Sequence, residues 1–220
     1  KTNDVVVVTY SATVAANATI AGAGNKNTAK LVYNEKDSTK EETTTYVWKL
    51  NVHKYALDST NHEVALSGAK FVLYRMDNGV KKYAKLTNKK IVGWVTDKDN
   101  ATTLETSGTG DILIEGLNVG TYYLEETEAP VGYNKLTEPI EVEITATTSV
   151  TSGSETVQYK NSSETSYTPA TDATVKVLNN AGTQLPSTGG IGTTIFYVIG
   201  GVLMAVAAVL LVTKKRMNNK

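Results

Sequence analysis

Hydrophobic residues follow one pattern over most of the 220-residue chain and a different pattern near its C-terminus. From Tyr46 onward they form short runs rich in β-branched and aromatic residues, separated by turn clusters such as MDNG, TDKDN and TSGTG. Short runs bounded by turn residues are typical of β-strands. A helical period is nowhere sustained before Gly189. The pattern predicts an all-β domain, which we place at residues 44–181.

The C-terminal pattern is a continuous apolar run. No charged residue occurs in the 25 residues from 189 to 213. A helix of that length would reach about 37 Å, and the hydrocarbon core of a bilayer is about 30 Å thick. Lys214, Lys215 and Arg216 follow directly, and basic residues beside a span stay on the cytoplasmic side. We therefore predict a single transmembrane helix over residues 189–213, a stop-transfer cytoplasmic tail over residues 214–220, and an extracellular N-terminal part.

Residues 1–43 contain two strand-like runs, Asp4–Tyr10 and Ala29–Tyr33. So few strands do not enclose a hydrophobic core by themselves. We interpret residues 1–43 as the C-terminal end of an upstream domain, connected to the next domain by a polar joint at Glu41–Thr45. The chain begins at Lys1 without an apolar signal region, and we expect the true start of an exported protein to lie further upstream.

Three of the predicted strands continue an apolar row with a polar residue. Alternate residues of a strand share a face, so each polar residue is expected to point inward with its row. The apolar rows are Trp48, Leu50 and Val52, then Tyr122 and Leu124, then Val175 and Val177, and the residues that continue them are Lys54, Glu126 and Asn179. A single polar residue at a strand end is often simply exposed. If all three point inward they must meet, because lone buried charges are costly.

Composition and charge narrow the choice of function. Without the four basic residues of the tail, the chain has 18 Lys and Arg against 22 Asp and Glu, which argues against a nucleic-acid partner. Cysteine is absent, so a small extracellular domain must rely on its core or on another cross-link. His53 and His62 lack neighbouring metal-ligand residues, and no nucleophile motif surrounds the serines. We expect neither a metal ion nor a cofactor, and no hydrolase activity.

Two motifs resemble those of a known family. The run YYLEETEAPVGY, Tyr122–Tyr133, resembles the signature Tyr-x-Leu-x-Glu-Thr-x-Ala-Pro-x-Gly-Tyr of collagen-adhesin B-type (CnaB, SpaA-like) domains of Gram-positive surface proteins and pilins. The run LPSTG, Leu185–Gly189, resembles the sortase sorting motif of LPXTG-anchored proteins. The resemblance covers residues 44–220. It implies an immunoglobulin-like or prealbumin-like β-sandwich, a sorting signal over residues 182–188, and then the transmembrane helix. Residues 1–43 resemble the end of a preceding immunoglobulin-like fimbrial isopeptide-formation domain.

The resemblance also implies an intramolecular isopeptide bond between a Lys and an Asn. By this resemblance Lys54 is the nucleophile and Glu126 catalyses the reaction. An apolar pocket raises the pKa of a carboxyl group and lowers that of an amine, which favours a protonated glutamate and a neutral, nucleophilic lysine. A neutral carboxyl group can polarise the asparagine carbonyl and shuttle the protons. Asn179 is the favoured acceptor, and Asn161, which also ends an alternating run, is the alternative. Asn34 is a candidate acceptor in the upstream domain. The bond would form once, during folding, so the protein is not expected to be an enzyme.

The sorting motif implies a second covalent reaction, in which the chain is the substrate. By the resemblance, a sortase cleaves between Thr188 and Gly189 after recognising the pentapeptide Leu185, Pro186, Ser187, Thr188 and Gly189. The acyl group then passes to an amine of a peptidoglycan cross-bridge or of a neighbouring pilin subunit. The membrane is therefore expected to be only a transient anchor, and the mature protein to be covalently attached to the cell wall at the extracellular surface.

Two kinds of protein fit these features. One is a structural subunit of a cell-wall-anchored pilus, and the other is the stalk of an adhesin whose region for binding host surface ligands lies upstream. The pilin acceptor motif places Lys after Pro. Here Val, Ile, Ala and Ser follow the four prolines, which are Pro130, Pro139, Pro169 and Pro186. The absence of this motif from the chain leaves both kinds of protein open.

Overall fold

The computed structural model describes residues 7, 9, 15, 17–33, 36–37, 39–161, 164–182, 200, 203–204 and 214. Its regular elements are short strands and one 3-10 helix. They are β1 (Asn25–Ala29), β2 (Val32–Tyr33), β3 (Lys36–Asp37), β4 (Glu41–Thr45), β5 (Trp48–Leu57), β6 (Glu63–Ala65), β7 (Lys70–Asp77), β8 (Val80–Thr87), β9 (Lys90–Val95), η1 (Lys98–Asn100), β10 (Leu104–Glu105), β11 (Asp111–Leu117), β12 (Gly120–Glu128), β13 (Ile140–Thr148), β14 (Gly153–Lys160), β15 (Thr168–Pro169) and β16 (Thr174–Leu178).

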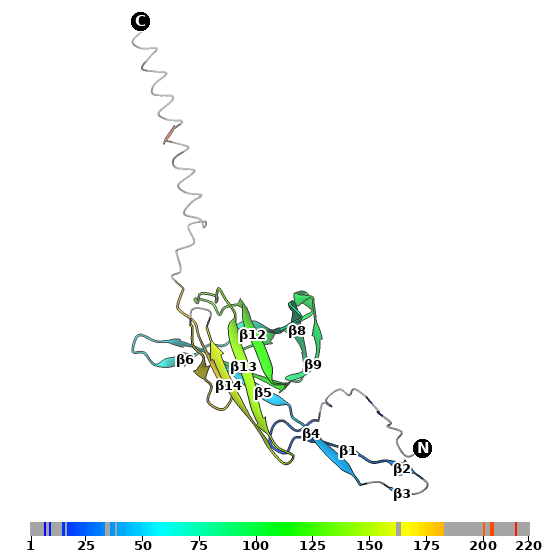
Figure 1. The fold of residues 1–220 in the computed structure, drawn as a ribbon. Helices are drawn as coiled ribbons and strands as arrows, with labels where there is room; N and C mark the ends of the chain where they lie inside the picture. The colour runs from blue at the N-terminus through cyan, green and yellow to red at the C-terminus, as the bar shows by residue number, and fades with distance from the viewer. Residues whose placement is uncertain are drawn as a thin grey trace. The chain divides into compact units, whose positions relative to one another are not determined.

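Most strands belong to one sheet with the order β15-β14-β13-β12-β7-β8-β9-β11-β5-β16. In addition, β10 pairs with β7 and β6 pairs with β5. Figure 1 shows β12, β13 and β14 side by side, as their antiparallel pairing requires. Two contacts are parallel, the single pair between Lys90 and Glu115 that joins β9 to β11 and the pairing of β16 with β5. The first long strand of the sheet therefore lies beside the last one.

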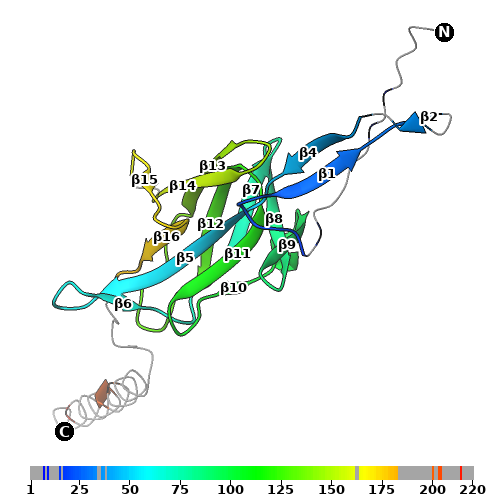
Figure 2. The same ribbon diagram turned by 90° about the horizontal axis from the view of Figure 1, so that it is seen from below.

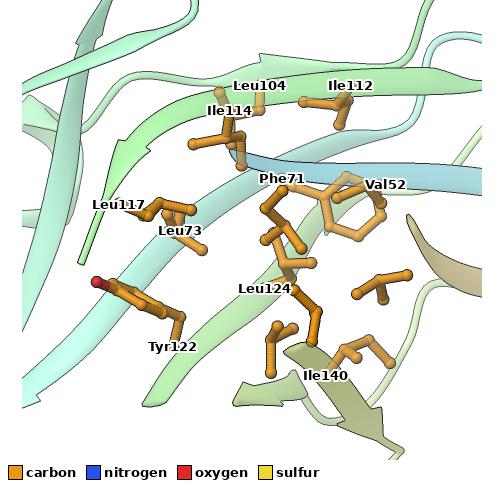
Figure 3. Packing of buried hydrophobic residues seen from close by; sticks show 14 of the residues in the cluster. Val52, Phe71, Leu73, Leu104, Ile112, Ile114, Leu117, Tyr122, Leu124 and Ile140 are labelled. Atoms are coloured by element: carbon orange, nitrogen blue, oxygen red, sulfur yellow. The ribbon is translucent and has the colours of Figure 1, made fainter. Parts of the chain in front are cut away.

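The sheet folds over so that β5, β11 and β16 lie across a shared core from β7, β12, β13 and β14 (Figure 2). Val52 and Ile114 from one layer meet Phe71, Leu73 and Leu124 from the other (Figure 3). These side chains are almost completely removed from solvent. The all-β prediction is confirmed, and the core lies between two layers of strands, as in a β-sandwich.

Strand β5 shows how alternating apolar residues in the sequence become buried residues of the core. Its residues alternate between buried and half-buried from Trp48 to Ala56. Lys54 lies in the buried row with Leu50 and Val52. The predicted inward row of β5, with the lysine continuing it, is therefore confirmed.

The segment expected to be a polar joint is a strand instead. Glu41–Thr45 forms β4, which pairs antiparallel with β1 over five residues. Thr43, Thr44 and Thr45 are polar, as expected of a linker, but they are also β-branched, and β-branched residues favour an extended strand. The run Ala29–Tyr33 is divided between the end of β1 and β2. The boundary that we placed between residues 43 and 44 therefore falls inside β4, and most of Asp4–Tyr10 lies outside the described residues.

Tyr46 connects the β4–β5 junction to the β13–β14 hairpin. Its ring stacks on Trp48 with centroids 5.7 Å apart and an interplanar angle of 7°. Its hydroxyl donates a hydrogen bond of 2.8 Å to the carbonyl oxygen of Ser149. The backbone N–H of Gly153 donates to the carbonyl oxygen of Gly22 at 2.9 Å. The segment that precedes β1 is thus held against the same hairpin that contacts Tyr46.

The predicted transmembrane helix, residues 189–213, lies almost entirely outside the described residues. Within the described part of the chain, no helix has both the length and the apolar character needed to cross a bilayer.

The contact around Tyr46 predicts that Gly153 cannot be enlarged without cost. A Cβ atom at Gly153 would lie 2.8 Å from Cδ1 of Tyr46 and 3.0 Å from Cη2 of Trp48. Overpacking of this kind costs about 1–3 kcal/mol, so Gly153→Ala should lower the free energy of unfolding by that amount. Urea unfolding followed by tryptophan fluorescence measures it. Gly93→Ala is the matched control, because Gly93 also lies in a strand and its Cβ would meet nothing within 4 Å. Equal stability of the two variants would contradict the prediction.

Candidate functional site

Three elements bring polar side chains to one place inside the sandwich. Lys54 lies on β5, Glu126 lies on β12, and Asn179 directly follows β16. The parallel register of β16 and β5 places Val177 beside Lys54. One step further, the backbone N–H of Asn179 donates to the carbonyl oxygen of Tyr55 at 2.9 Å. The pairing of the first and last strands of the sandwich therefore positions the asparagine next to the lysine.

The three side chains contact one another and are shielded from water. Lys54, Glu126 and Asn179 are 0%, 2% and 1% exposed. Lys54 Nζ donates a hydrogen bond to Asn179 Oδ1 and lies 3.3 Å from Glu126 Oε1. Asn179 Nδ2 donates to the same Glu126 Oε1 at 3.2 Å. One carboxylate oxygen is thus within reach of both the amine nitrogen and the amide nitrogen.

The remaining contacts of the cluster come from a loop and from the core. The backbone N–H of Leu136 donates to the second carboxylate oxygen, Glu126 Oε2, at 2.7 Å. Lys54 Nζ lies 5.6 Å from the centroid of the Phe71 ring. Among the described residues, every buried side-chain nitrogen and oxygen has a hydrogen-bond partner. The cluster is therefore fully satisfied in spite of its apolar surroundings.

Burial changes the acid–base behaviour of the lysine. Desolvation lowers the pKa of Lys54 from 10.5 to about 8, and the negative charge of Glu126 and its hydrogen bond partly oppose this effect. The neutral amine, which is the nucleophilic form, is thus far more populated near neutral pH than for an exposed lysine. An amine in this state beside an amide group, with a carboxylate contacting both nitrogens, is arranged for acyl transfer from the amide to the amine.

The structure separates the two asparagines between which the sequence left a choice. Asn161 lies at the end of β14, where its backbone N–H and its side-chain Nδ2 donate to Glu164 at 3.0 Å and 3.3 Å. Asn179, and not Asn161, is the residue that contacts Lys54.

Other predicted site residues have no described contacts. Asn34, the sorting motif Leu185–Gly189, and two stop-transfer residues, Lys215 and Arg216, lie outside the described residues, and Lys214 is exposed. In the part of the chain that the structure describes, no group of three or more His, Asp or Glu side chains could hold a metal ion. Sequence reasoning missed Leu136, because its contribution is a backbone N–H that any residue except proline supplies.

Comparison with known families identifies the domain that contains Lys54 and Glu126. The SpaA family of prealbumin-like fold domains matches residues 48–163, more than half of the chain. The chain belongs to this family. Its fold is prealbumin-like, and the prealbumin-like expectation is confirmed.

A second match lies at the C-terminus. The LPXTG cell wall anchor motif matches residues 178–219. The motif identifies a surface protein of Gram-positive bacteria that is covalently anchored to the cell wall, as the sequence predicted. No curated protein matches the chain.

Several solved structures are similar to the SpaA-type chain. The pilus 2b backbone protein of group B streptococcus is 28% identical, with a TM-score of 0.46 over 74% of this chain and 52% of that protein. The SpaE basal pilin of Lactobacillus rhamnosus GG is 20% identical, with a TM-score of 0.46 over 62% of this chain and 48% of that pilin. The major pilin RrgB of Streptococcus pneumoniae is 22% identical, with a TM-score of 0.42 over 67% of this chain and 32% of that pilin. The chain spans about half the length of the first two.

The lowered pKa of Lys54 predicts how the rate of an attack by its amine on the Asn179 amide would depend on pH. Below a pKa of about 8 the charged form predominates, so the rate should rise about tenfold per pH unit and level off above about pH 8. Chains isolated in denaturant before folding can be diluted into buffers from about pH 6 to about pH 9. An amide bond formed between Lys54 and Asn179 would release ammonia, and mass spectrometry follows this loss. A rate that stays constant over this range would contradict a role for the amine as nucleophile.

Proposed function

We propose that this SpaA-type chain is a structural subunit of a cell-wall-anchored pilus and that it is stabilised by an intramolecular isopeptide bond between Lys54 and Asn179. The observation that carries the proposal is the buried cluster in which Lys54, Glu126 and Asn179 contact one another. A buried lysine and a buried glutamate are rarely found unless they serve each other or a reaction.

The proposed reaction exchanges one amide nitrogen for another. Lys54 Nζ attacks Cγ of Asn179, the bond from Cγ to Nδ2 breaks, and the new amide joins the two side chains. Glu126 Oε1 accepts a proton from Nζ and delivers a proton to Nδ2, which leaves as ammonia. Both nitrogens lie within 3.3 Å of this oxygen, so the carboxylate does not need to move between the two proton transfers. The product is permanent, and the chain reacts once.

The bond would close a long loop. Lys54 and Asn179 are 125 residues apart, and by analogy with disulfides a loop of this size contributes on the order of 4–5 kcal/mol in the chain-entropy treatment. It would join the first strand of the sandwich to the strand paired beside it, so that tension along the chain acts on a covalent bond. A chain without cysteine would thereby gain a cross-link that does not depend on redox conditions.

The sorting motif carries the second part of the proposal. We propose that sortase cleaves between Thr188 and Gly189 and joins Thr188 to a peptidoglycan cross-bridge or to a neighbouring pilin subunit. The support is the match of residues 178–219 to the LPXTG anchor. Residues 182–188 would form the sorting signal, and the apolar run 189–213 with its tail 214–220 would hold the chain in the membrane until cleavage.

The domain organisation is part of the same proposal. Residues 44–181 would form the SpaA-type sandwich and residues 1–43 the end of an upstream fimbrial domain, with β4 crossing the boundary between them. An adhesin stalk is the second candidate, because none of the four prolines is followed by the lysine of the pilin acceptor motif. In that case an upstream region would bind host surface ligands.

The isopeptide bond predicts a measurable loss of mass. The full chain of residues 1–220, purified in detergent, should weigh one ammonia less than its sequence, because bond formation releases the Asn179 amide nitrogen. Glu126→Ala and the isosteric Glu126→Gln should both restore the sequence mass, since neither can transfer the protons.

Glu125→Ala is the matched control for these variants. Glu125 is the neighbouring residue on β12, but it lies half-buried beside Lys98 instead of in the cluster. This variant should lose the ammonia like the unchanged chain. An unchanged chain with its full sequence mass would overturn the proposal.

Anchoring predicts a change in cell fractionation. Thr188→Ala should leave the protein in the membrane fraction, because sortase forms its acyl intermediate on this threonine in the LPXTG reaction that we propose. Ser187→Ala changes the variable position of the motif and should still give protein attached covalently to the wall. The measurement is release by a wall hydrolase after extraction with detergent, and wall attachment of the Thr188→Ala protein would contradict the sortase reaction.

A further inference from the structure

We propose that the loop of residues 129–139, between β12 and β13, is a latch that positions both the acceptor strand and the catalytic carboxylate for isopeptide formation. Gly132 is then a positioning residue that gives the latch its shape. This inference rests on the proposed function, and it assigns a role to the part of the signature run that follows Glu126.

The first set of latch contacts holds the residues that follow Asn179. The backbone N–H of Asn134 donates to the carbonyl oxygen of Asn180 at 3.0 Å. Tyr133 forms an antiparallel bridge with Ala181, and Asn134 Nδ2 donates to the carbonyl oxygen of Ala181 at 3.5 Å. Strand β16 ends at Leu178, so the latch holds the chain directly beyond Asn179.

The second contact holds the carboxylate. Two residues beyond Asn134, the backbone N–H of Leu136 donates to Glu126 Oε2 at 2.7 Å. This bond occupies one carboxylate oxygen and leaves the other, Oε1, directed at Lys54 Nζ and Asn179 Nδ2. One short segment therefore fixes the carboxylate and the end of the acceptor strand relative to each other. Alignment of reacting groups at this level is a main source of rate acceleration.

The shape of the latch depends on a turn with a left-handed residue. The backbone N–H of Tyr133 donates to the carbonyl oxygen of Pro130 at 3.1 Å. Gly132, the third residue of this turn, has a φ of +89°, as a type II turn requires at that position. A Cβ atom at Gly132 would meet nothing within 4 Å. The glycine is therefore needed for its backbone conformation and not for space, and a substitution there tests the conformation alone.

A latch of this kind makes bond formation conditional on docking of the last strand. Asn180 and Ala181 reach the loop only when β16 lies in place beside β5. The carboxylate is oriented by the same loop. The reaction would therefore proceed only in a domain that has closed up to Ala181, and a chain with an undocked last strand would stay unlinked.

The test compares variants of two glycines that both have a positive φ. Full chains are isolated in denaturant, diluted into detergent buffer, and weighed over time for the loss of ammonia. Gly132→Ala should slow bond formation by about tenfold or more, because the latch is strained open. Gly79→Ala is the control, since Gly79 has a φ of +79° in the β7–β8 turn and its Cβ would also meet nothing within 4 Å. Gly79→Ala should change the rate of bond formation by less than about twofold. Gly132→Asn should recover most of the rate that Gly132→Ala loses, because Asn tolerates a positive φ.

A second measurement separates positioning from folding. Each glycine variant is combined with Lys54→Ala, which removes the nucleophile, and refolding is followed by tryptophan fluorescence. In this background Gly132→Ala and Gly79→Ala should refold at similar rates. Equal rates of ammonia loss for the two glycine variants would overturn the latch. The latch would also be overturned if Gly132→Ala slowed refolding by as large a factor as it slows bond formation. If the unchanged chain loses no ammonia, the proposed function fails together with the latch, and this outcome is distinct from the other two.

Discussion

The structure of this domain depends on the burial of a lysine amine. Lys54 has no exposed surface, and an unpaired charge in such a place costs several kcal/mol. The domain meets this cost by lowering the pKa of the amine and by bringing a carboxylate and an amide into contact with it. These partners come from strands far apart in the chain, so the lysine is satisfied only when β5, β12 and β16 have assembled.

The same constraint explains the arrangement of the strands around the site. A lone lysine on β5 would favour exposure of that strand. The parallel pairing of β16 brings Asn179 to the amine, and the antiparallel pairing of β12 with β7 places Glu126 on the opposite side of the core. Under the proposed reaction, the ionisable amine of Lys54 becomes part of a neutral amide, ammonia leaves, and Glu126 remains buried beside the new bond. The reaction would thus replace a titratable lysine in the core by a covalent link between β5 and the end of β16.

The ends of the sandwich are held in different ways. At the N-terminal end, Tyr46 stacks on Trp48 and binds the β13–β14 hairpin, so β4 leads into β5 through a packed junction. At the C-terminal end, backbone hydrogen bonds from the β12–β13 loop hold the chain as far as Ala181. The sorting motif begins at Leu185, only a few residues later. The segment that sortase would cleave therefore follows within a few residues of Ala181, which the β12–β13 loop contacts.

Strand alternation was enough to predict the all-β domain and the inward direction of Lys54, Glu126 and Asn179, because a period of two fixes the face on which each residue lies. Composition and two short motifs were enough to indicate the family and the wall anchor.

Alternation could not choose between Asn179 and Asn161, since both follow alternating strands and only strand pairing brings one of them to Lys54. It also failed for Glu41–Thr45, because a polar threonine-rich segment is compatible with a joint and with an exposed strand. The hydrogen bond from the backbone N–H of Leu136 to Glu126 could not be predicted from the sequence, because every residue except proline carries a backbone N–H. Only the tertiary fold directs this N–H at the carboxylate.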